Sequence, residues 1–273
     1  MIVVTLWSCV AKRGNISRQK FNSQFGCSIS PPQQQHTMNF VAIDTEFVAC
    51  TRVDGGLIEH PRPRVRRADA RDKRYKEDGG RRRTLRRIVQ VGATKMDMSG
   101  NELDSFVAYI KLDDAYTFDE SARDAQVARI TRATLEAEGI SWTDAYIRLE
   151  ELIDENTECV VAHGYKAAEL DVLEIECFLD GFEWPYGANS SQWRCTLDMW
   201  KRLSPGESRG RGASTVDSIY RRLLGDEAQT HREGDVHDAL GDARMCGAIY
   251  VKLRALEQER AFEEALMNMP LTR

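Results

Sequence analysis

The chain has 273 residues, of which 42% are apolar, and a formal net charge of −5. That length and apolar content are sufficient for one sizeable hydrophobic core, and the small negative charge gives no whole-chain sign of a nucleic-acid binder. No apolar stretch reaches the ~20 residues that a membrane-spanning helix needs, so we expect no membrane-spanning segment.

The N-terminal part differs in composition from the remainder. Residues 1–43 contain no Asp or Glu, and they carry Lys12, Arg13, Arg18 and Lys20 among several serines. We expect residues 1–38 to be a disordered extension. A transit peptide is an alternative for the same composition. Met38 directly precedes the first predicted strand, so a start at that residue is a third reading.

Cysteine usage favours an intracellular protein. The seven cysteines include no C-x-x-C pair and their number is odd, which argues against a disulfide framework or a zinc site. We therefore expect the cytoplasm or the nucleus, or the mitochondrion if residues 1–38 act as a transit peptide.

Strand and helix signals then alternate along the chain. Short apolar runs rich in Val, Ile and Phe predict strands at 39–47, 88–94, 105–112 and 158–162, with a turn at 98–101. Helical spacing predicts helices at 121–137, 142–154, 166–180, 195–203, 214–224 and 238–268. This order predicts the α/β class, a mixed sheet whose first three strands are antiparallel and which is flanked by helices. We expect one domain at 39–260, followed by a helix end and tail at 261–273.

A basic stretch at 51–87 interrupts this pattern. It holds fourteen Lys or Arg against six Asp or Glu, a surplus of eight positive charges. Few of its side chains are apolar, so we expect a long exposed insertion. A solvated loop would account for it, and so would a nucleic-acid contact or a localisation signal. We favour the nucleic-acid contact because the insertion leaves directly from an acidic strand.

That acidic strand carries the first candidate site. Residues two apart in a strand face the same side, so Asp44 and Glu46 project together from the apolar segment FVAIDTEF. Two carboxylates held together in apolar surroundings are costly unless they are protonated or bound to a cation. Mg²⁺ and similar hard cations select carboxylate oxygens, although acids at strand ends often simply face solvent.

Two later segments supply further candidates. VVAHGYKAAELDVL ends a strand at His163 and begins a helix with Glu169 and Asp171, where acids are also common without any function. In HDALGDAR, His237 and Asp242 are five residues apart and would diverge by about 140° on one helix. They can meet only if His237 precedes the helix and Asp242 lies in its first turns.

In this order, the three segments resemble the DEDDh group of 3′–5′ exonucleases, which has the RNase H-like fold. Asp44 and Glu46 match its first motif, VVAHGYKAAELDVL approximates its second, and His237 with Asp242 matches its third. IVQVGAT resembles the family's second strand, and the resemblance covers residues 39–253. Two features depart from the family: the basic insertion and the spacing of the second motif.

The second motif leaves two carboxylates open. The family usually places its Asp about five residues after the His of the strand end, whereas Glu169 is six and Asp171 eight residues after His163. We prefer Asp171 for its residue type and its apolar neighbours, with Glu169 as the alternative.

The resemblance implies a metal-dependent 3′–5′ exonuclease that releases nucleoside 5′-monophosphates from the 3′ end of single-stranded RNA or DNA. Two divalent ions, Mg²⁺ or Mn²⁺, would be held by Asp44, Glu46, Asp171 and Asp242, with His237 as the general base. A catalytically inactive nucleic-acid-binding module on the same fold is the alternative. An RNase H-like endonuclease is a third class, which His237 at this spacing argues against.

Substrate contacts are predicted less specifically. Basic and aromatic side chains bind single strands through phosphates and base stacking. The basic candidates are Arg81–Arg83, Arg86 and Arg87. The aromatic candidates are Trp184, Tyr186 and Trp193, of which we expect at least one to fill the core instead.

Overall fold

The computed structural model describes residues 38–58, 84–164, 169–186, 190–207, 212–225 and 237–268, and all structural statements below concern these ranges. They belong to one compact unit, Thr37–Arg273. Residues 1–37, which make up nearly all of the predicted extension, lie outside the described part of the chain. So do residues 59–83, the larger part of the predicted insertion.

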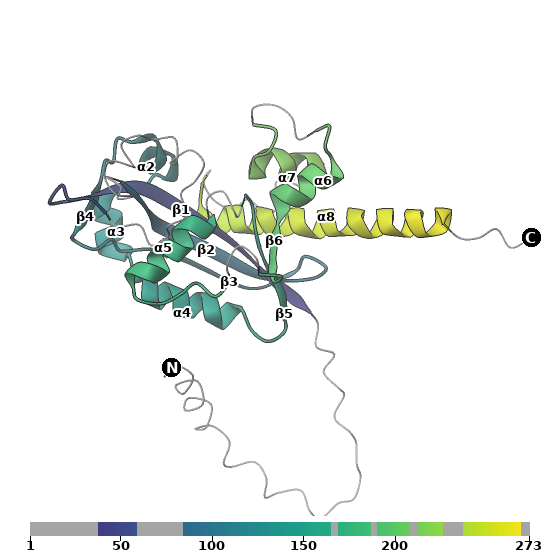
Figure 1. The fold of residues 1–273 in the computed structure, drawn as a ribbon, viewed down its shortest axis with the longest axis horizontal. Helices are drawn as coiled ribbons and strands as arrows, with labels where there is room; N and C mark the ends of the chain where they lie inside the picture. The colour runs from purple at the N-terminus through teal and green to yellow at the C-terminus, as the bar shows by residue number, and fades with distance from the viewer. Residues whose placement is uncertain are drawn as a thin grey trace, which may run out of the picture. The chain divides into compact units, whose positions relative to one another are not determined.

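A mixed sheet forms the centre of this unit (Figure 1). Its strands run in the order β3-β2-β1-β5-β6, with β4 paired to the end of β1. β1, β2 and β3 are antiparallel, as the sequence predicts, and β5 is parallel to both β1 and β6. The strand bounds are β1 Asn39–Arg52, β2 Leu85–Asp97, β3 Glu102–Tyr109, β4 Tyr116–Phe118, β5 Thr157–Ala162 and β6 Trp193–Cys195.

Helices cover both faces of the sheet (Figure 1). α4 and α5 pack on one face, and α8 packs on the other with α6 and α7 against it. The helix bounds are α2 Arg123–Ala128, α3 Arg132–Glu138, α4 Trp142–Leu152, α5 Glu169–Leu179, α6 Thr196–Leu203, α7 Val216–Leu224 and α8 Ala239–Met267. None of these helices is long and apolar enough to cross a membrane.

β1 is the central strand, and both of its faces are buried. Val41 and Ile43 belong to the core cluster that includes α4 and α5. Phe40 and Ala42 belong to the cluster that includes α8. Covering on both faces explains why the strand reads as an almost continuous apolar run. Because side chains alternate, Asp44 and Glu46 continue the face of Phe40 and Ala42, toward α8.

Several predicted elements differ from those of the structure. The helix predicted at 121–137 is two helices, because Arg129 adopts a left-handed conformation with φ of 53° and ends α2. β1 continues to Arg52 and β2 already begins at Leu85. The insertion is therefore shorter at both ends than predicted. β4 and β6 were not predicted, since three residues are too few to display an alternating pattern.

Candidate active site

The site begins on β1, where two carboxylates face the start of α8. Asp44 lies opposite Gly92 and Glu46 opposite Gln90 in the antiparallel pairing with β2. Asp44 is 9% exposed and Glu46 is half-buried. The strand therefore holds both acids rigidly at the edge of the core.

The first turn of α8 is fixed against β2 by a small hydrogen-bond network. Asp238 is the N-cap of α8, and one of its carboxylate oxygens accepts from the Gly241 N–H at 3.0 Å. Its other oxygen accepts from Gln90 Nε2 at 3.1 Å. Gln90 Oε1 in turn accepts from the Ala239 N–H at 3.1 Å. Gln90 thus binds the N-cap side chain and the helix backbone together.

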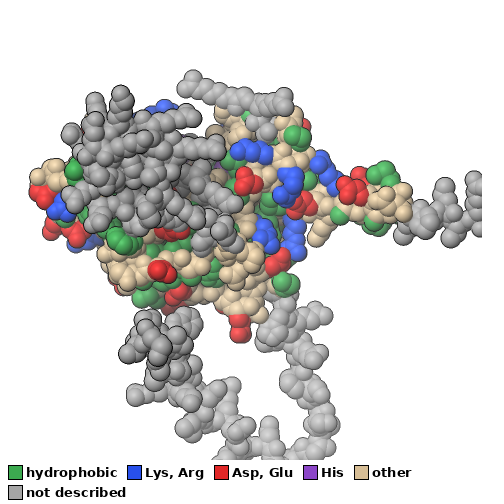
Figure 2. All heavy atoms as spheres, in the orientation of Figure 1, with side chains coloured by type: hydrophobic (Ala, Val, Ile, Leu, Met, Phe, Trp, Pro, Cys, Tyr) green, Lys and Arg blue, Asp and Glu red, His purple; other side chains and the backbone are tan. Residues whose placement is uncertain are grey.

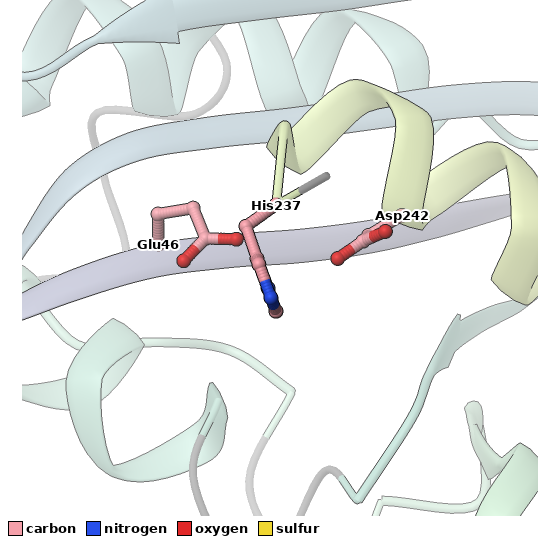
Figure 3. Close-up of side chains that lie close together, drawn as sticks. All are labelled: Glu46, His237 and Asp242. Atoms are coloured by element: carbon pink, nitrogen blue, oxygen red, sulfur yellow. The ribbon is translucent and has the colours of Figure 1, made fainter. Parts of the chain in front are cut away.

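This network leaves His237 directly before the helix, with φ of 66°, and Asp242 within its first turn. Ligand atoms of Glu46, His237 and Asp242 all lie within 4.8 Å of one another. Figure 3 shows the three side chains converging, Glu46 from β1 and the other two from the start of α8. Of the sequence-predicted residues, the structure therefore brings together Asp44 and Glu46 on one strand and places His237 and Asp242 against Glu46.

α5 places its two candidate carboxylates differently. Glu169 is 8% exposed, whereas Asp171 is half-buried. Residues two positions apart on an α-helix differ by about 200° around the helix axis. Only one of Glu169 and Asp171 can therefore face a given site. The charge of Glu169 raises the pKa of both Asp44 and Glu46, as expected for a carboxylate that faces the β1 acids.

Each of these carboxyl groups makes ionisation of its neighbours less favourable. Burial, followed by the charges of Asp242, Glu169 and Glu46, raises the pKa of Asp44 well above its usual range. Burial and the charge of Asp242 raise the pKa of Glu46 to about 8. Burial raises the pKa of Glu169 to about 7, against a lowering influence of Arg86. Among the described residues, negative charge thus concentrates at one place, with Arg86 acting against it at Glu169.

These residues fit divalent cations. Carboxylate oxygens are the ligands that Mg²⁺ and Mn²⁺ prefer, and the site offers four carboxylates with an adjacent imidazole. Glu169 Oε2 is buried and has no hydrogen-bond partner among the described residues, although buried carboxylate oxygens normally have one. A bound cation would satisfy that oxygen and remove the mutual repulsion of the acids.

Without metal, the folded protein is expected to lose stability as the pH rises from about 6.5 to 8.5. The Glu46 carboxyl has an ordinary pKa of 4.5 and a folded pKa of about 8. The folded state therefore binds more protons than the unfolded state in this window, and stability falls by up to about 1.4 kcal/mol per pH unit. Burial lowers the pKa of His163 from its ordinary value of 6.5, so His163 becomes neutral in both states as the pH rises through this range and does not reverse the trend.

Thermal unfolding in EDTA at several pH values measures this effect. Glu46→Gln is expected to flatten the profile, because the amide does not titrate. Mn²⁺ is expected to stabilise the wild type most at pH 8.5, where the unbound carboxylates repel most. An EDTA profile that rises between pH 6.5 and 8.5 contradicts the expectation.

The predicted substrate contacts divide into two groups. The prediction for Arg87 is wrong, because its guanidinium is buried in an ion pair with Glu176. Trp184 and Trp193 are 7% and 8% exposed and fill the core, with Tyr186 packed against it. Arg86 is exposed, lies 4.9 Å from the Phe47 ring centroid and acts electrostatically on Glu169, so it borders the site. Arg81–Arg83 lie outside the described residues.

The sequence analysis missed Gln90, which ties α8 to β2. The sequence did contain a signal, since a polar amide interrupts the apolar run IVQVGAT. In the structure this amide side chain is only 5% exposed. A buried polar side chain requires partners, so its position predicts a hydrogen-bonded neighbour. The identity of that neighbour, Asp238, depends on a contact across 148 residues that no local pattern shows.

Comparison with known proteins identifies relatives of this architecture. The sequence model of the RNase T type exonuclease family matches residues 41–250. No curated protein matches the chain. The nuclease domain of 3′hExo, a DEDDh family member bound to rAMP, is similar at 14% identity and a TM-score of 0.52. That similarity covers 82% of this chain and 94% of the domain.

Exonuclease I of E. coli in complex with single-stranded DNA is similar at 18% identity and a TM-score of 0.55. This similarity covers 85% of this chain and 43% of exonuclease I. A product-bound exonuclease I is similar at 17% identity and a TM-score of 0.53, covering 85% and 46%. This chain thus spans less than half the length of those proteins. These likenesses confirm the predicted RNase H-like fold.

Proposed function

Because this chain belongs to the exonuclease family, we propose that it is a metal-dependent 3′–5′ exonuclease. It hydrolyses the terminal phosphodiester bond of single-stranded nucleic acid and releases nucleoside 5′-monophosphates. The observation that carries the proposal is the convergence of Glu46, Asp242 and His237 within 4.8 Å, beside Asp44. Paired carboxylates with an adjacent imidazole suit a phosphodiester hydrolase that uses divalent ions.

Asp44, Glu46, Asp242 and Glu169 are the proposed ligands of two divalent ions. From the sequence, Asp171 was the preferred ligand and Glu169 the alternative. We now propose Glu169 in place of Asp171. Burial of Glu169, its unpartnered oxygen and its charge on Asp44 support this choice. Asp171 is half-buried and lies about 200° around α5 from Glu169.

His237 is the proposed general base. When bound, the two ions would activate a water molecule and neutralise charge on the phosphate. The imidazole takes the proton of the attacking water, a general-base role that histidine commonly fills. The water oxygen bonds to phosphorus, the bond from phosphorus to the 3′ oxygen breaks, and that oxygen leaves after taking a proton from solvent water. Gln90 and Asp238 hold the start of α8, and so fix the imidazole beside Glu46.

Arg86 is the proposed contact to the substrate phosphates, since it is exposed at the border of the site. Lys and Arg side chains also gather over α6 and α8 (Figure 2). There, however, Arg202 and Arg254 pair with Glu257 and Glu158, so these two charges are locally compensated. The complexes of exonuclease I with single-stranded DNA support a single-stranded substrate for this chain as well.

Single strands of RNA and DNA, each labelled at the 5′ end or the 3′ end, test the proposal in Mg²⁺ and in Mn²⁺. We expect a ladder that shortens from the 3′ end and the early release of labelled monophosphate from the 3′-labelled strand. Asp44→Asn is expected to lower the rate by on the order of 10³-fold, since loss of a ligand removes several kcal/mol of transition-state stabilisation.

Three outcomes would oppose the proposal. Equal activity of Asp44→Asn and wild type would show that the site is not the catalytic one. Binding of strands without any shortening would favour the inactive binding module. Cleavage of a circular single strand would favour an endonuclease.

A further inference from the structure

A buried ion pair joins β2 to α5 away from the carboxylate cluster. Arg87 Nε and Nη2 donate to the two carboxylate oxygens of Glu176, both at 2.8 Å. The Arg87 side chain is 6% exposed and that of Glu176 is fully buried. The guanidinium also lies 4.7 Å from the ring centroid of Tyr116. A bidentate pair of this kind has a fixed orientation and not merely a fixed distance.

Glu176 also accepts from the backbone of β2. Its Oε1 lies 2.8 Å from the Ile88 N–H. β3 pairs with β2 only as far as Gln90, so Ile88 lies beyond that strand ladder. The carboxylate therefore supplies an acceptor that a neighbouring strand would otherwise provide, and it fastens α5 to one point on the backbone of β2.

The same helix face carries Glu169. Glu169 and Glu176 are seven residues apart, which places them about 20° apart around the axis and about 10 Å apart along it. Val172 and Leu173 lie between them and are fully buried. The stripe of Asp171, Glu174 and Phe178 is more exposed. The face that Glu176 fastens to β2 is thus the face from which Glu169 reaches the β1 acids.

We propose that Arg87 and Glu176 are positioning residues that set the rotation of α5 and thereby hold the Glu169 carboxylate at the metal site. The inference rests on the function proposed above. A rotation of about 20° would move a group about 6 Å from the helix axis by about 2 Å. Displacements of about 1 Å are sufficient to disturb a catalytic site. Neither residue touches the reacting atoms, and both act through Glu169.

Two matched double variants isolate the contact to the Ile88 N–H. Arg87→Met with Glu176→Gln removes both charges but keeps an acceptor for that N–H group. Arg87→Met with Glu176→Leu removes the charges and the acceptor. Replacement of both members of a buried pair avoids leaving one charge without a partner. Calorimetry of the metal-free proteins with Mn²⁺ measures binding, and thermal unfolding measures stability.

The Met/Leu protein is expected to bind Mn²⁺ about tenfold more weakly than the Met/Gln protein, an effect typical of groups that orient metal ligands. In a Glu169→Gln background this difference is expected to fall below about twofold, while the difference in melting temperature persists. If the role of Glu176 were purely structural, the Glu169→Gln background would change neither the difference in Mn²⁺ affinity nor the difference in melting temperature. If the Met/Leu protein does not fold, Glu176→Asp replaces it, since this side chain keeps its charge but is shorter by about 1.5 Å.

The outcomes separate this inference from the function on which it rests. Absence of Mn²⁺ binding by the wild type would overturn both. Equal Mn²⁺ affinities of a folded Met/Leu protein and the Met/Gln protein, or of a folded Glu176→Asp protein and the wild type, would overturn the positioning role alone. So would a binding difference that persists without the Glu169 carboxylate.

Discussion

Glu169→Gln is expected to lower the rate of strand shortening by on the order of 10²- to 10³-fold, whereas Asp171→Asn is expected to leave it within about threefold. The amide keeps the size of the side chain but loses the charge that would bind a divalent ion. Glu169 is buried beside Asp44, and Asp171 projects from the other side of α5. The two variants therefore form a matched pair on one helical turn.

Rates on a labelled single strand at saturating Mn²⁺ measure the comparison, and melting temperatures in EDTA provide its control. Burial raises the pKa of Glu169 to about 7, and its charge raises the pKa of Asp44, so the neutral amide relieves repulsion. The metal-free Glu169→Gln protein is expected to be at least as stable as the wild type. A larger loss of activity in Asp171→Asn than in Glu169→Gln would reverse the assignment.

The β1 and α8 parts of the site were predictable from local patterns. The period of two in a strand places Asp44 and Glu46 on one side, whatever surrounds that strand. The sequence requires His237 before the helix and Asp242 in its first turns if the two are to meet, and the structure has this arrangement, with Asp238 as the N-cap. In both cases the backbone geometry alone fixes how the side chains relate.

The rotation of α5 was not predictable in the same way. Its acids lie on two opposite sides, Glu169 with Glu176 and Asp171 with Glu174, so no single polar face indicates the orientation of the helix. Glu176 settles the orientation through Arg87 and the Ile88 N–H, contacts across 89 and 88 residues. The proposed choice of Glu169 over Asp171 thus rests on a tertiary contact, which residue type alone does not reveal.

Gly92→Ala is expected to disturb the site without altering any polar side chain. Gly92 lies opposite Asp44, where the start of α8 approaches β2 closely. A Cβ atom at this position would lie 2.3 Å from the carbonyl carbon of Ala239 and 2.3 Å from the Leu240 nitrogen. Both are backbone atoms, so α8 must move by about 1 Å, and His237 and Asp242 must move with it.

The expected cost is about 3 kcal/mol of stability, the upper part of the usual range for overpacking, and a melting temperature lower by about 5–10 °C. Activity at a temperature where the variant remains folded is expected to fall by on the order of 10²-fold, because the imidazole and the α8 carboxylate are displaced from Glu46. Gly206→Ala is the matched control, since a Cβ at Gly206 meets no atom within 4 Å. Wild-type activity in a folded Gly92→Ala protein would mean that the close approach of α8 to β2 does not position the catalytic residues. Loss of activity in Gly92→Ala but not in Gly206→Ala would show that catalysis depends on the position of α8 relative to β2.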